Sequence, residues 1–366
     1  MSAHRRWAAA VLATAMAGMG TVAVVPSATA DGAARPPVKV ITSGLDGPFG
    51  LQASRLGYLV AEGDSGQVTG VLRDGSKHVL LDGAAGVAGV AGGPRHFYAV
   101  LGGGSEAGPP PAGDYKPTSV LRSTYTGHHV TVLANLMRYE LRHNPDGQRQ
   151  FNKKGVPFND ALSNPFSMNL SRYGLLVAEG GANDVLRIDP RTGRVSTFFV
   201  PPTVKDVAAC LQPGAQSNPG TVGCDSVPTG IAVARHSVYV STLGGGVPGA
   251  GRVYRLNPWT GKVLHVWKGF TGPTGIAVSC TGTIYLSEVF YGAPEGDGPP
   301  PADFDPSSVG RITRIRDGHV THAQVTMPVG LSLSHGRLYS TAWSVAGQFG
   351  MPHAGQIVMV RGSAFR

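Results

Sequence analysis

The chain has little cysteine, little charge and few aromatic residues. Of its 366 residues only three are cysteines, 14% are charged and 7% are aromatic. It contains no G-x-S-x-G nucleophile elbow, no H-E-x-x-H zinc motif and no glycine loop that opens a helix to hold phosphate. After residue 30, no apolar run approaches the length of a membrane-spanning helix. Serine hydrolases, zinc peptidases and nucleotide-binding folds therefore find no support in the sequence.

The charges are unbalanced but scattered. Lysine and arginine outnumber aspartate and glutamate by 31 to 22, which gives a formal net charge of +9. The basic residues form no stripe and are little interleaved with aromatics, so the sequence does not favour nucleic-acid binding.

The amino terminus has the pattern of an export signal. Arg5 and Arg6 precede an apolar run from Trp7 to Val25, and Ala28-Thr29-Ala30 forms an A-x-A cleavage site before Asp31. We expect residues 1–30 to be a signal peptide and residues 31–366 to be the mature, secreted domain. Membrane attachment would require the signal region to be retained. In an oxidising compartment, Cys210 and Cys224 are expected to form a disulfide, which leaves Cys280 without a partner.

A short phrase recurs along the mature chain. It consists of a small turn with a glycine, an apolar strand, a polar turn and a second apolar strand, as in Pro48-Phe49-Gly50-Leu51 before Tyr58 to Glu62. Further copies begin at Val87, Pro165, Pro228, Pro273 and Pro328. Six such all-β units predict a six-bladed β-propeller, with four strands in each blade.

The last blade is one strand short. It runs through Gln356 to Val360 and then stops, whereas Val38 to Thr42 forms an unassigned strand near the amino terminus. We predict that this amino-terminal strand completes the last blade and closes the ring, which removes exposed strand edges.

Loop lengths distinguish the two faces of the predicted disc. Turns between first and second strands, and between third and fourth strands, are short, and they carry His96, His236 and His335. The long connections all emerge on the other face, which is where function is normally carried on a rigid scaffold. We therefore place the functional site on this long-loop face.

Three glutamates occupy the same strand position. Glu62, Glu179 and Glu288 end the second strands of blades one, three and five. They could approach the axis and hold Ca²⁺, which favours oxygen ligands. Alternatively, each carboxylate could accept backbone N–H bonds from the turn that follows its strand.

Two proline-rich loops resemble each other. Residues 108–115 and 298–304 end in Tyr115 and Phe304, and their blades would lie opposite each other across the channel mouth. Proline runs could hold these aromatics ready for a ligand, together with Tyr139, Tyr291 and Trp343. Alternatively, the prolines stiffen long loops and the aromatics pack on neighbouring blades.

The connection from Ala134 to Ser163 is the most distinctive stretch. Residues 135–141 have helical periodicity, and Asn144-Pro145-Asp146-Gly147 ends the helix with a turn. We expect this short helix to lie over the channel mouth.

The chain resembles the ScyD/ScyE family of exported bacterial propeller proteins. The resemblance is carried by Tyr139-Glu140, Asn144-Pro145-Asp146-Gly147 and Ser163-Asn164-Pro165-Phe166. Where the family more often has Asp-Ser-Asn-Pro-Tyr-Gly, this chain has Leu162, Phe166 and Ser167 in place of the Asp, Tyr and Gly. The resemblance implies a secreted propeller, and no reaction is attached to the family. The Pro-x-Gly strands alone are shared with NHL and gluconolactonase-like propellers.

The sequence predicts a secreted propeller that binds a small molecule or a cell-envelope partner on its long-loop face. The alternative is a metal-dependent hydrolase of the gluconolactonase or strictosidine-synthase-like kind, in which Glu62, Glu179 and Glu288 hold a Ca²⁺ that polarises a carbonyl. A third class is an interaction module of the cell envelope that uses the proline-rich loops.

Overall fold

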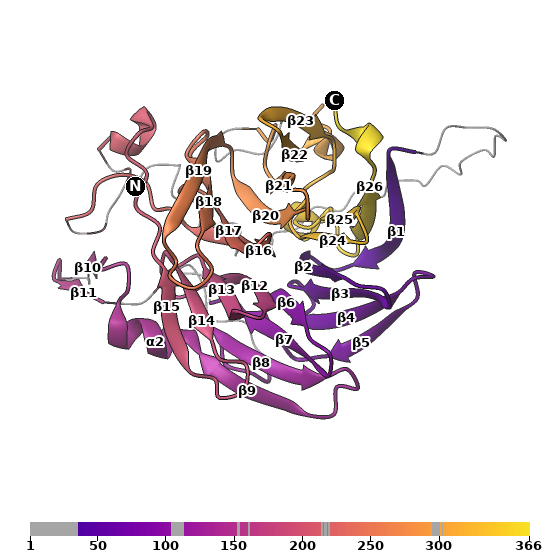
Figure 1. The fold of residues 1–366 in the computed structure, drawn as a ribbon, viewed down its shortest axis with the longest axis horizontal. Helices are drawn as coiled ribbons and strands as arrows, with labels where there is room; N and C mark the ends of the chain where they lie inside the picture. The colour runs from indigo at the N-terminus through magenta and orange to yellow at the C-terminus, as the bar shows by residue number, and fades with distance from the viewer. Residues whose placement is uncertain are drawn as a thin grey trace.

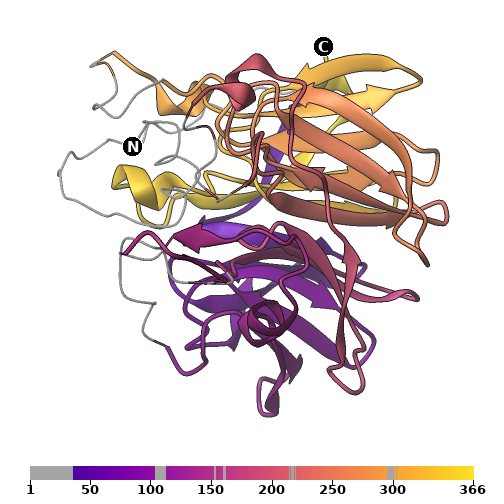
Figure 2. The ribbon, with the colours of Figure 1, turned by 90° about the vertical axis from the view of Figure 1, so that its left-hand side faces the viewer.

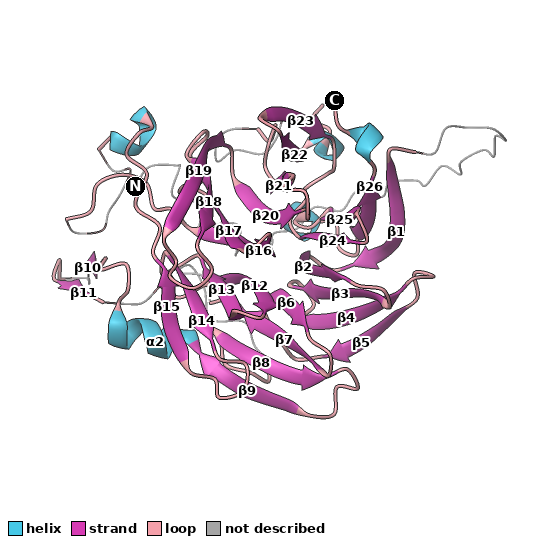
Figure 3. Ribbon diagram, in the orientation of Figure 1, coloured by secondary structure: helices cyan, strands magenta, loops and turns pink. Residues whose placement is uncertain are grey.

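A computed structural model describes residues 36–103, 113–151, 154–159, 162–213, 215, 218, 220–294, 301 and 303–366. The predicted signal peptide and most of both proline-rich loops lie outside the described residues. The described chain is almost entirely β-structure, with six four-stranded sheets arranged around a common axis (Figures 1 and 3). The predicted all-β, six-bladed propeller is confirmed.

Each blade is an antiparallel meander whose first strand is innermost. Blade 1 consists of β2 (Pro48–Ala53), β3 (Gly57–Glu62), β4 (Gln67–Leu72) and β5 (Lys77–Leu81). Blade 2 consists of β6 (Val87–Gly92), β7 (His96–Leu101), β8 (Ser119–Thr124) and β9 (Val130–Asn135). Blade 3 consists of β12 (Pro165–Ser171), β13 (Gly174–Glu179), β14 (Asp184–Ile188) and β15 (Val195–Phe199).

Blades 4 and 5 repeat this order. Blade 4 consists of β16 (Pro228–Ala234), β17 (Ser237–Thr242), β18 (Gly251–Leu256) and β19 (Val263–Phe270). Blade 5 consists of β20 (Pro273–Val278), β21 (Ile284–Glu288), β22 (Arg311–Arg316) and β23 (His319–Ala323).

The ring closes through the amino-terminal strand, as predicted. Blade 6 consists of β24 (Leu331–Ser334), β25 (Arg337–Ala342), β26 (Gly355–Val360) and β1 (Val38–Leu45). β1 pairs antiparallel with β26, from Val38 opposite Val360 to Leu45 opposite Gly355. The two ends of the described chain are thus joined in one sheet.

The repeated glycine is required by close packing between inner strands. A Cβ on Gly275 would lie 2.1 Å from the carbonyl oxygen of Val329 in the next blade, and one on Gly330 would lie 2.4 Å from that of Phe49. Gly50 and Gly89 meet the neighbouring backbone at 2.8 Å in the same way. Any side chain here would push two blades apart, so these positions favour glycine.

The core lies between the blades. Separate apolar clusters fill the contacts between blades 1 and 2, 2 and 3, 3 and 4, 4 and 5, 5 and 6, and 6 and 1. These clusters contain fully buried residues of the second strands, such as Val60, Leu176, Val240 and Leu286. This distribution leaves the axis itself open.

The long and short connections separate by face. The 3-10 helix η3 (Ala346–Phe349), in the connection between β25 and β26, lies at the left of the disc in Figure 2, whereas hairpin turns of blade 4 project at the right. We call these the long-loop face and the short-turn face.

The predicted helix exists, but its position was wrong. It is α2 (Leu136–His143), capped by Asn135, whose side chain accepts from Arg138 N–H, and ended by Asn144 in a left-handed conformation. It lies at the outer edge of blades 2 and 3, and the Tyr139 hydroxyl contacts Thr197 of β15 at 2.9 Å (Figure 1). Burial of Leu136 against the apolar cluster between these blades draws the helix to the rim rather than over the axis.

Two further expectations concern export. Cys210 and Cys224 form the predicted disulfide, and Cys280 is a free, exposed thiol. In the part of the chain that the structure describes, no helix is long and apolar enough to cross a membrane.

Candidate functional site

The three equivalent glutamates are buried, and each serves its own blade. Glu62 Oε2 accepts from the backbone N–H of Asp46 at 2.7 Å, and its other oxygen accepts from the Thr69 hydroxyl. Glu179 accepts from the Ser163 hydroxyl and from Ala182 N–H, both at 2.6 Å. Glu62 therefore binds the segment before its blade and the neighbouring strand β4. Glu179 binds the segment before its blade and the turn after β13.

Glu288 is the charge-paired member of the set. Its Oε1 accepts from Thr271 N–H at 2.8 Å. Its Oε2 accepts from Arg311 Nε at 2.7 Å and from the Thr313 hydroxyl at 2.5 Å. Donors thus occupy both oxygens of the carboxylate.

These contacts fit three separate anchors rather than one metal site. Asp46, Ser163 and Thr271 each stand two residues before the proline that begins the inner strand, so the glutamate of a blade fastens the entry to that blade. Among the described residues, no three His, Cys, Asp or Glu side chains converge as a metal site would require. Of the three glutamates, only Glu179 accepts a hydrogen bond from the turn that follows its strand. Glu62 and Glu288 accept backbone hydrogen bonds from the segment before the inner strand of their blade.

The predicted ligand-binding aromatics do not gather in one place. Tyr115 packs against the cluster between blades 1 and 2, and Tyr139 packs between blades 2 and 3. Tyr291 lies under the Arg311 guanidinium, 3.4 Å from its ring centre. Phe304 and Trp343 pack together with Phe49 and Phe166 in one apolar cluster.

That cluster marks the long-loop end of the axial channel. Phe49 and Phe166 are the second residues of their inner strands, and their ring centres are 6.1 Å apart. Phe304 and Trp343, both half-buried, come from the long connections of blades 5 and 6 and cover them. We call Phe49, Phe166, Phe304 and Trp343 the aromatic rim.

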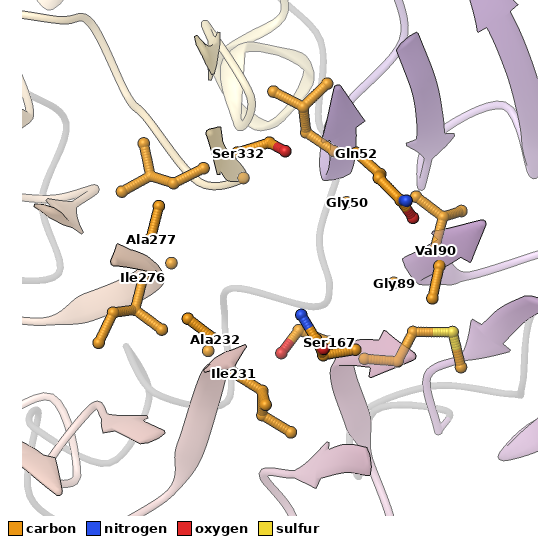
Figure 4. Close-up of a pocket in the computed structure, with 18 of the residues that line it drawn as sticks. Gly50, Gln52, Gly89, Val90, Ser167, Ile231, Ala232, Ile276, Ala277 and Ser332 are labelled. Atoms are coloured by element: carbon orange, nitrogen blue, oxygen red, sulfur yellow. The ribbon is translucent and has the colours of Figure 1, made fainter. Parts of the chain in front are cut away.

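The channel is a cavity of about 270 Å³ lined by the six inner strands. Figure 4 shows residues of these strands, among them Gln52, Val90, Ile231, Ile276 and Ser332, around an open centre. Every described residue that lines it is uncharged. The lining thus offers apolar contact and neutral hydrogen-bonding groups.

Gln52, Asn169 and Ser332 are the polar side chains toward the short-turn end of the channel, and Ser167 and Thr274 line it nearer the aromatic rim. Gln52 donates to Gly92 O at 3.3 Å and also accepts from Gly92 N–H, and the Ser332 hydroxyl accepts from Ala53 N–H at 2.9 Å. Asn169, at the same strand position as Gln52 and Ser332, makes no side-chain hydrogen bond to any described residue. Its amide is free to bind a ligand.

A second polar region lies off the axis, where α2 meets blade 3. Glu140 on α2, Asp146 after it, Glu179 at the end of β13 and Asp184 at the start of β14 form what we call the carboxyl cluster. Asp184 is completely buried, and neither of its carboxyl oxygens has a hydrogen-bond partner among the described residues. None of the four forms a salt bridge within the described chain.

Burial and repulsion between neighbouring carboxylates raise the pKa of all four groups. Desolvation, followed by the charges of Glu179 and Asp146, raises the pKa of Glu140 to about 9. Desolvation, then the charge of Glu140, raises the pKa of Asp184 well above its usual value. Desolvation also raises the pKa of Glu179 to about 7 and raises that of Asp146. Because Glu140 and Asp184 lie close together and are both buried, the state in which both are charged is disfavoured.

Above the carboxyl cluster lies a small polar pocket of about 40 Å³. Glu140, Asp146, Gln148, Asn183 and Asp225 line part of it. Gln148 Nε2 donates to Asp225 Oδ1 at 2.9 Å, and Asn183 Nδ2 donates to Asp146 Oδ2 at 3.3 Å. This volume suits ordered water rather than an organic ligand.

The sequence interpretation missed the carboxyl cluster and the free amide of Asn169. A signal for the first was present, because Asp184 begins a strand that continues with the apolar Val185 and Leu186, and it stands opposite Glu179 in the ladder. Aspartate is disfavoured in strands, so a buried aspartate at this place indicates a partner.

Comparison with known proteins supports the fold. No protein-family model and no curated protein matches the sequence. Among solved structures, the chain is similar to a protein of Thermus thermophilus assigned as a glucose dehydrogenase, with 16% identity, a TM-score of 0.52, and coverage of 88% of this chain and 98% of that chain. It is also similar to a gluconolactonase of Xanthomonas campestris, with 13% identity, a TM-score of 0.51 and coverage of 88% and 89%.

A third similar structure is a calcium-binding regucalcin of Agrobacterium tumefaciens. It has 11% identity and a TM-score of 0.49, and the match covers 87% of this chain and 90% of that chain. At these identities the likeness establishes the six-bladed fold alone.

Proposed function

We propose that this protein binds an uncharged small molecule in its axial channel, entered past the aromatic rim on the long-loop face. The observation that carries the proposal is the channel lining, which is neutral throughout and includes the unbonded amide of Asn169. A ligand pocket typically combines apolar walls with a few polar groups that fix orientation.

The two ends of the channel define the ligand. The aromatic rim offers flat apolar surface at one end, and Gln52, Asn169 and Ser332 offer amide and hydroxyl groups toward the other. A charged ligand would lose its hydration without gaining an opposite charge. The proposed ligand is therefore neutral, with an apolar part and a hydroxyl- or amide-bearing part.

The sequence resemblance and the disulfide extend this proposal. We infer an exported ScyD/ScyE-like protein whose residues 1–30 are removed, because the Cys210–Cys224 disulfide is compatible with an oxidising compartment. A cell-envelope partner that binds the proline-rich loops remains a prediction, since these loops lie largely outside the described residues.

The proposal is tested by titrating purified protein with 4-nitrophenyl glycosides, which are uncharged and carry both an aromatic ring and hydroxyl groups. We expect saturable binding, measured by calorimetry, that weakens at least tenfold in Asn169→Leu because the polar end loses its partner. Asn257→Ala, in a turn of the short-turn face, is the matched control and should bind like the unmodified protein. No saturable binding to any glycoside, or equal losses in both variants, would overturn the proposal.

The metal-dependent hydrolase remains the rival function, and the same preparation tests it. The predicted ligands Glu62, Glu179 and Glu288 do not fit a shared Ca²⁺, because each is occupied within its own blade. Elemental analysis that finds one Ca²⁺ per chain, lost in Glu179→Gln, would favour the hydrolase and contradict the binding proposal.

A further inference from the structure

The short-turn face carries an uneven distribution of charge. The turns between first and second strands surround the end of the channel opposite the aromatic rim, and all six are described. In blades 1 to 4 each of these turns contains one arginine; in order these are Arg55, Arg95, Arg172 and Arg235. In blade 6 the turn contains His335 and is followed by Arg337. None of the six turns contains an aspartate or a glutamate.

These basic side chains are linked from blade to blade. Arg55 Nε donates to His335 Nε2 at 2.7 Å, which joins blades 1 and 6. Arg172 of blade 3 contacts His236 Nδ1 of blade 4, and Arg235 Nη1 donates to Thr281 O of blade 5 at 2.9 Å. The contacts pre-orient the guanidinium groups around the channel end instead of leaving them free in solvent.

The basic character is most concentrated at blade 4. A cavity of about 420 Å³ opens there, lined by Arg235, His236, Tyr239 and Arg255. We call it the arginine pocket. Tyr239 is buried, while Arg235 and His236 are exposed, so the cavity has an aromatic floor and cationic walls.

The guanidinium groups of the pocket have unused hydrogen-bonding capacity. Arg255 Nε donates to Ser237 Oγ at 3.0 Å, and Arg235 uses one Nη for Thr281. Each guanidinium has five N–H donors, and neither is ion-paired with a carboxylate in the described chain. By contrast, Arg252, Arg311 and Arg316 elsewhere in the protein each have an acidic partner.

The acidic residues of this face lie on the outer turns and are engaged there. Asp74 accepts from Ser76, Asp189 accepts from the backbone of Arg191 and Thr192, and Asp317 pairs with Arg316. None lines the arginine pocket.

The backbone of the turn that carries Arg235 is strained. Arg235 and His236 form the two-residue turn between β16 and β17, and both have left-handed φ values, +47° and +60°. Such turns favour Asn-Gly, because most side chains are strained there. Blade 6 builds the same kind of turn with a glycine, His335-Gly336. Asparagine or glycine would be less strained than Arg235 at this position.

We propose that the arginine pocket binds a phosphate- or sulfate-bearing ligand. Arginine forks match tetrahedral oxyanions with paired N–H donors, which is why they recur in such sites. His236, whose Nδ1 faces Arg172, can donate from Nε2, and the exposed turns of the neighbouring blades extend the positive surface. This site shares no lining residue with the neutral channel and lies on the face opposite the aromatic rim.

The ligand could be a small phosphoester or a segment of an anionic polymer, and two probes distinguish these sources. Tripolyphosphate and long-chain polyphosphate would be titrated by calorimetry at low ionic strength, with inorganic phosphate as the minimal probe. Equal affinities per site indicate a small ligand. A tenfold or greater preference for the polymer, lost in Arg55→Gln, indicates a polymer that follows the ring of arginines.

If recognition is specific, substitutions in the arginine pocket weaken binding, whereas a substitution elsewhere on the same face does not. Arg235→Gln and Arg255→Gln should each weaken tripolyphosphate binding at least tenfold. Arg316→Gln removes one positive charge from an exposed outer turn of the same face and should change the affinity less than twofold. Equal losses in all three variants, or no saturable binding at millimolar tripolyphosphate, would overturn the proposal.

A stability measurement separates a binding role from a structural one. Because Arg235 occupies a left-handed conformation that asparagine adopts more easily, Arg235→Asn should raise the melting temperature while it abolishes binding. A lower melting temperature together with unchanged binding would mean that Arg235 serves the fold, and the proposal would fail.

Discussion

A buried carboxyl group in this protein takes its role from its nearest donors rather than from its place in the repeat. Glu62, Glu179 and Glu288 share one strand position, yet Glu288 is paired with Arg311 whereas Glu179 faces Asp184 across the ladder. Burial raises the pKa of Glu179 to about 7. Equivalent positions in a repeat thus need not share an electrostatic environment.

The carboxyl cluster makes stability depend on pH. The pKa of Glu140 is raised to about 9, so between about pH 4.5 and 9 the folded state binds more protons than the unfolded state. Its contribution to stability is therefore complete below pH 4.5 and is lost as pH rises toward 9. We expect Glu140→Gln, which keeps a hydrogen-bonding side chain without a charge, to raise the urea midpoint at pH 8 and flatten this alkaline limb. Each pKa unit corresponds to about 1.4 kcal/mol, so an effect on the order of a few kcal/mol is expected.

Asp305→Asn serves as the control for this pH profile. Hydrogen bonds from Ser307 lower the pKa of Asp305, so its contribution is present above its usual pKa and lost only at acid pH. This variant should leave the alkaline limb unchanged. An unaltered alkaline limb in Glu140→Gln would show that the titration of Glu140 does not cause the loss of stability at high pH.

The repeated glycine offers a second test on the residue scale. Gly275→Ala places a methyl group 2.1 Å from Val329 O and 2.9 Å from Ser287 Oγ, and the blades must separate to admit it. We expect a loss of about 1–3 kcal/mol in the free energy of unfolding, measured by urea titration. Gly362→Ala meets nothing within 4 Å and should change stability by less than about 0.5 kcal/mol. Equal effects would remove the packing explanation of the Pro-x-Gly repeat.

On the scale of elements, the sequence predicts the bounds of strands well but predicts poorly where a helix packs on the propeller. The predicted strand from Tyr58 to Glu62 lies within β3, because the alternation of apolar strands and polar turns is a local property. The bounds of α2 are also close to the predicted 135–141, because Asn135 and Asn144 cap it as local signals suggest. Its place at the rim depends on Leu136 packing between blades 2 and 3, a tertiary contact that periodicity does not report.

The same distinction applies to the candidate sites. The sequence identifies residues of unusual type, such as the three glutamates, but not the donors that surround them. The neutral channel is formed by residues from six distant segments, and the arginine pocket depends on the Arg235-His236 turn meeting Arg255 of another strand. In the sequence these arginines are scattered, and only the ring brings them to one face.

On the scale of the molecule, the propeller separates two chemistries along its axis. The long-loop end carries the aromatic rim, and the short-turn end carries basic turns without acidic residues. The neutral channel connects them. Because each end is built from several blades, the integrity of the ring decides whether either site exists.

Ring closure rests on β1, and its removal tests the whole architecture. β1 supplies the outer strand of blade 6, and the almost fully buried Leu45 packs between blades 6 and 1. Lys77 of blade 1 also donates to Ser43 O at 2.8 Å and Gly44 O at 2.7 Å. A chain that begins at residue 46 loses these contacts and exposes the edge of β26, whereas one that begins at residue 36 keeps them.

We expect the chain that begins at residue 46 to lose at least about 3 kcal/mol in urea unfolding, since the loss of one buried leucine alone has effects of this order. It should also associate in a concentration-dependent way on size-exclusion chromatography, because an unpaired edge strand invites pairing with another chain. The chain that begins at residue 36 is the control and should remain as stable as the protein lacking residues 1–30. Matching midpoints for the two truncated chains would mean that blade 6 holds without its fourth strand, and closure by the amino-terminal strand would then not account for the stability of the ring.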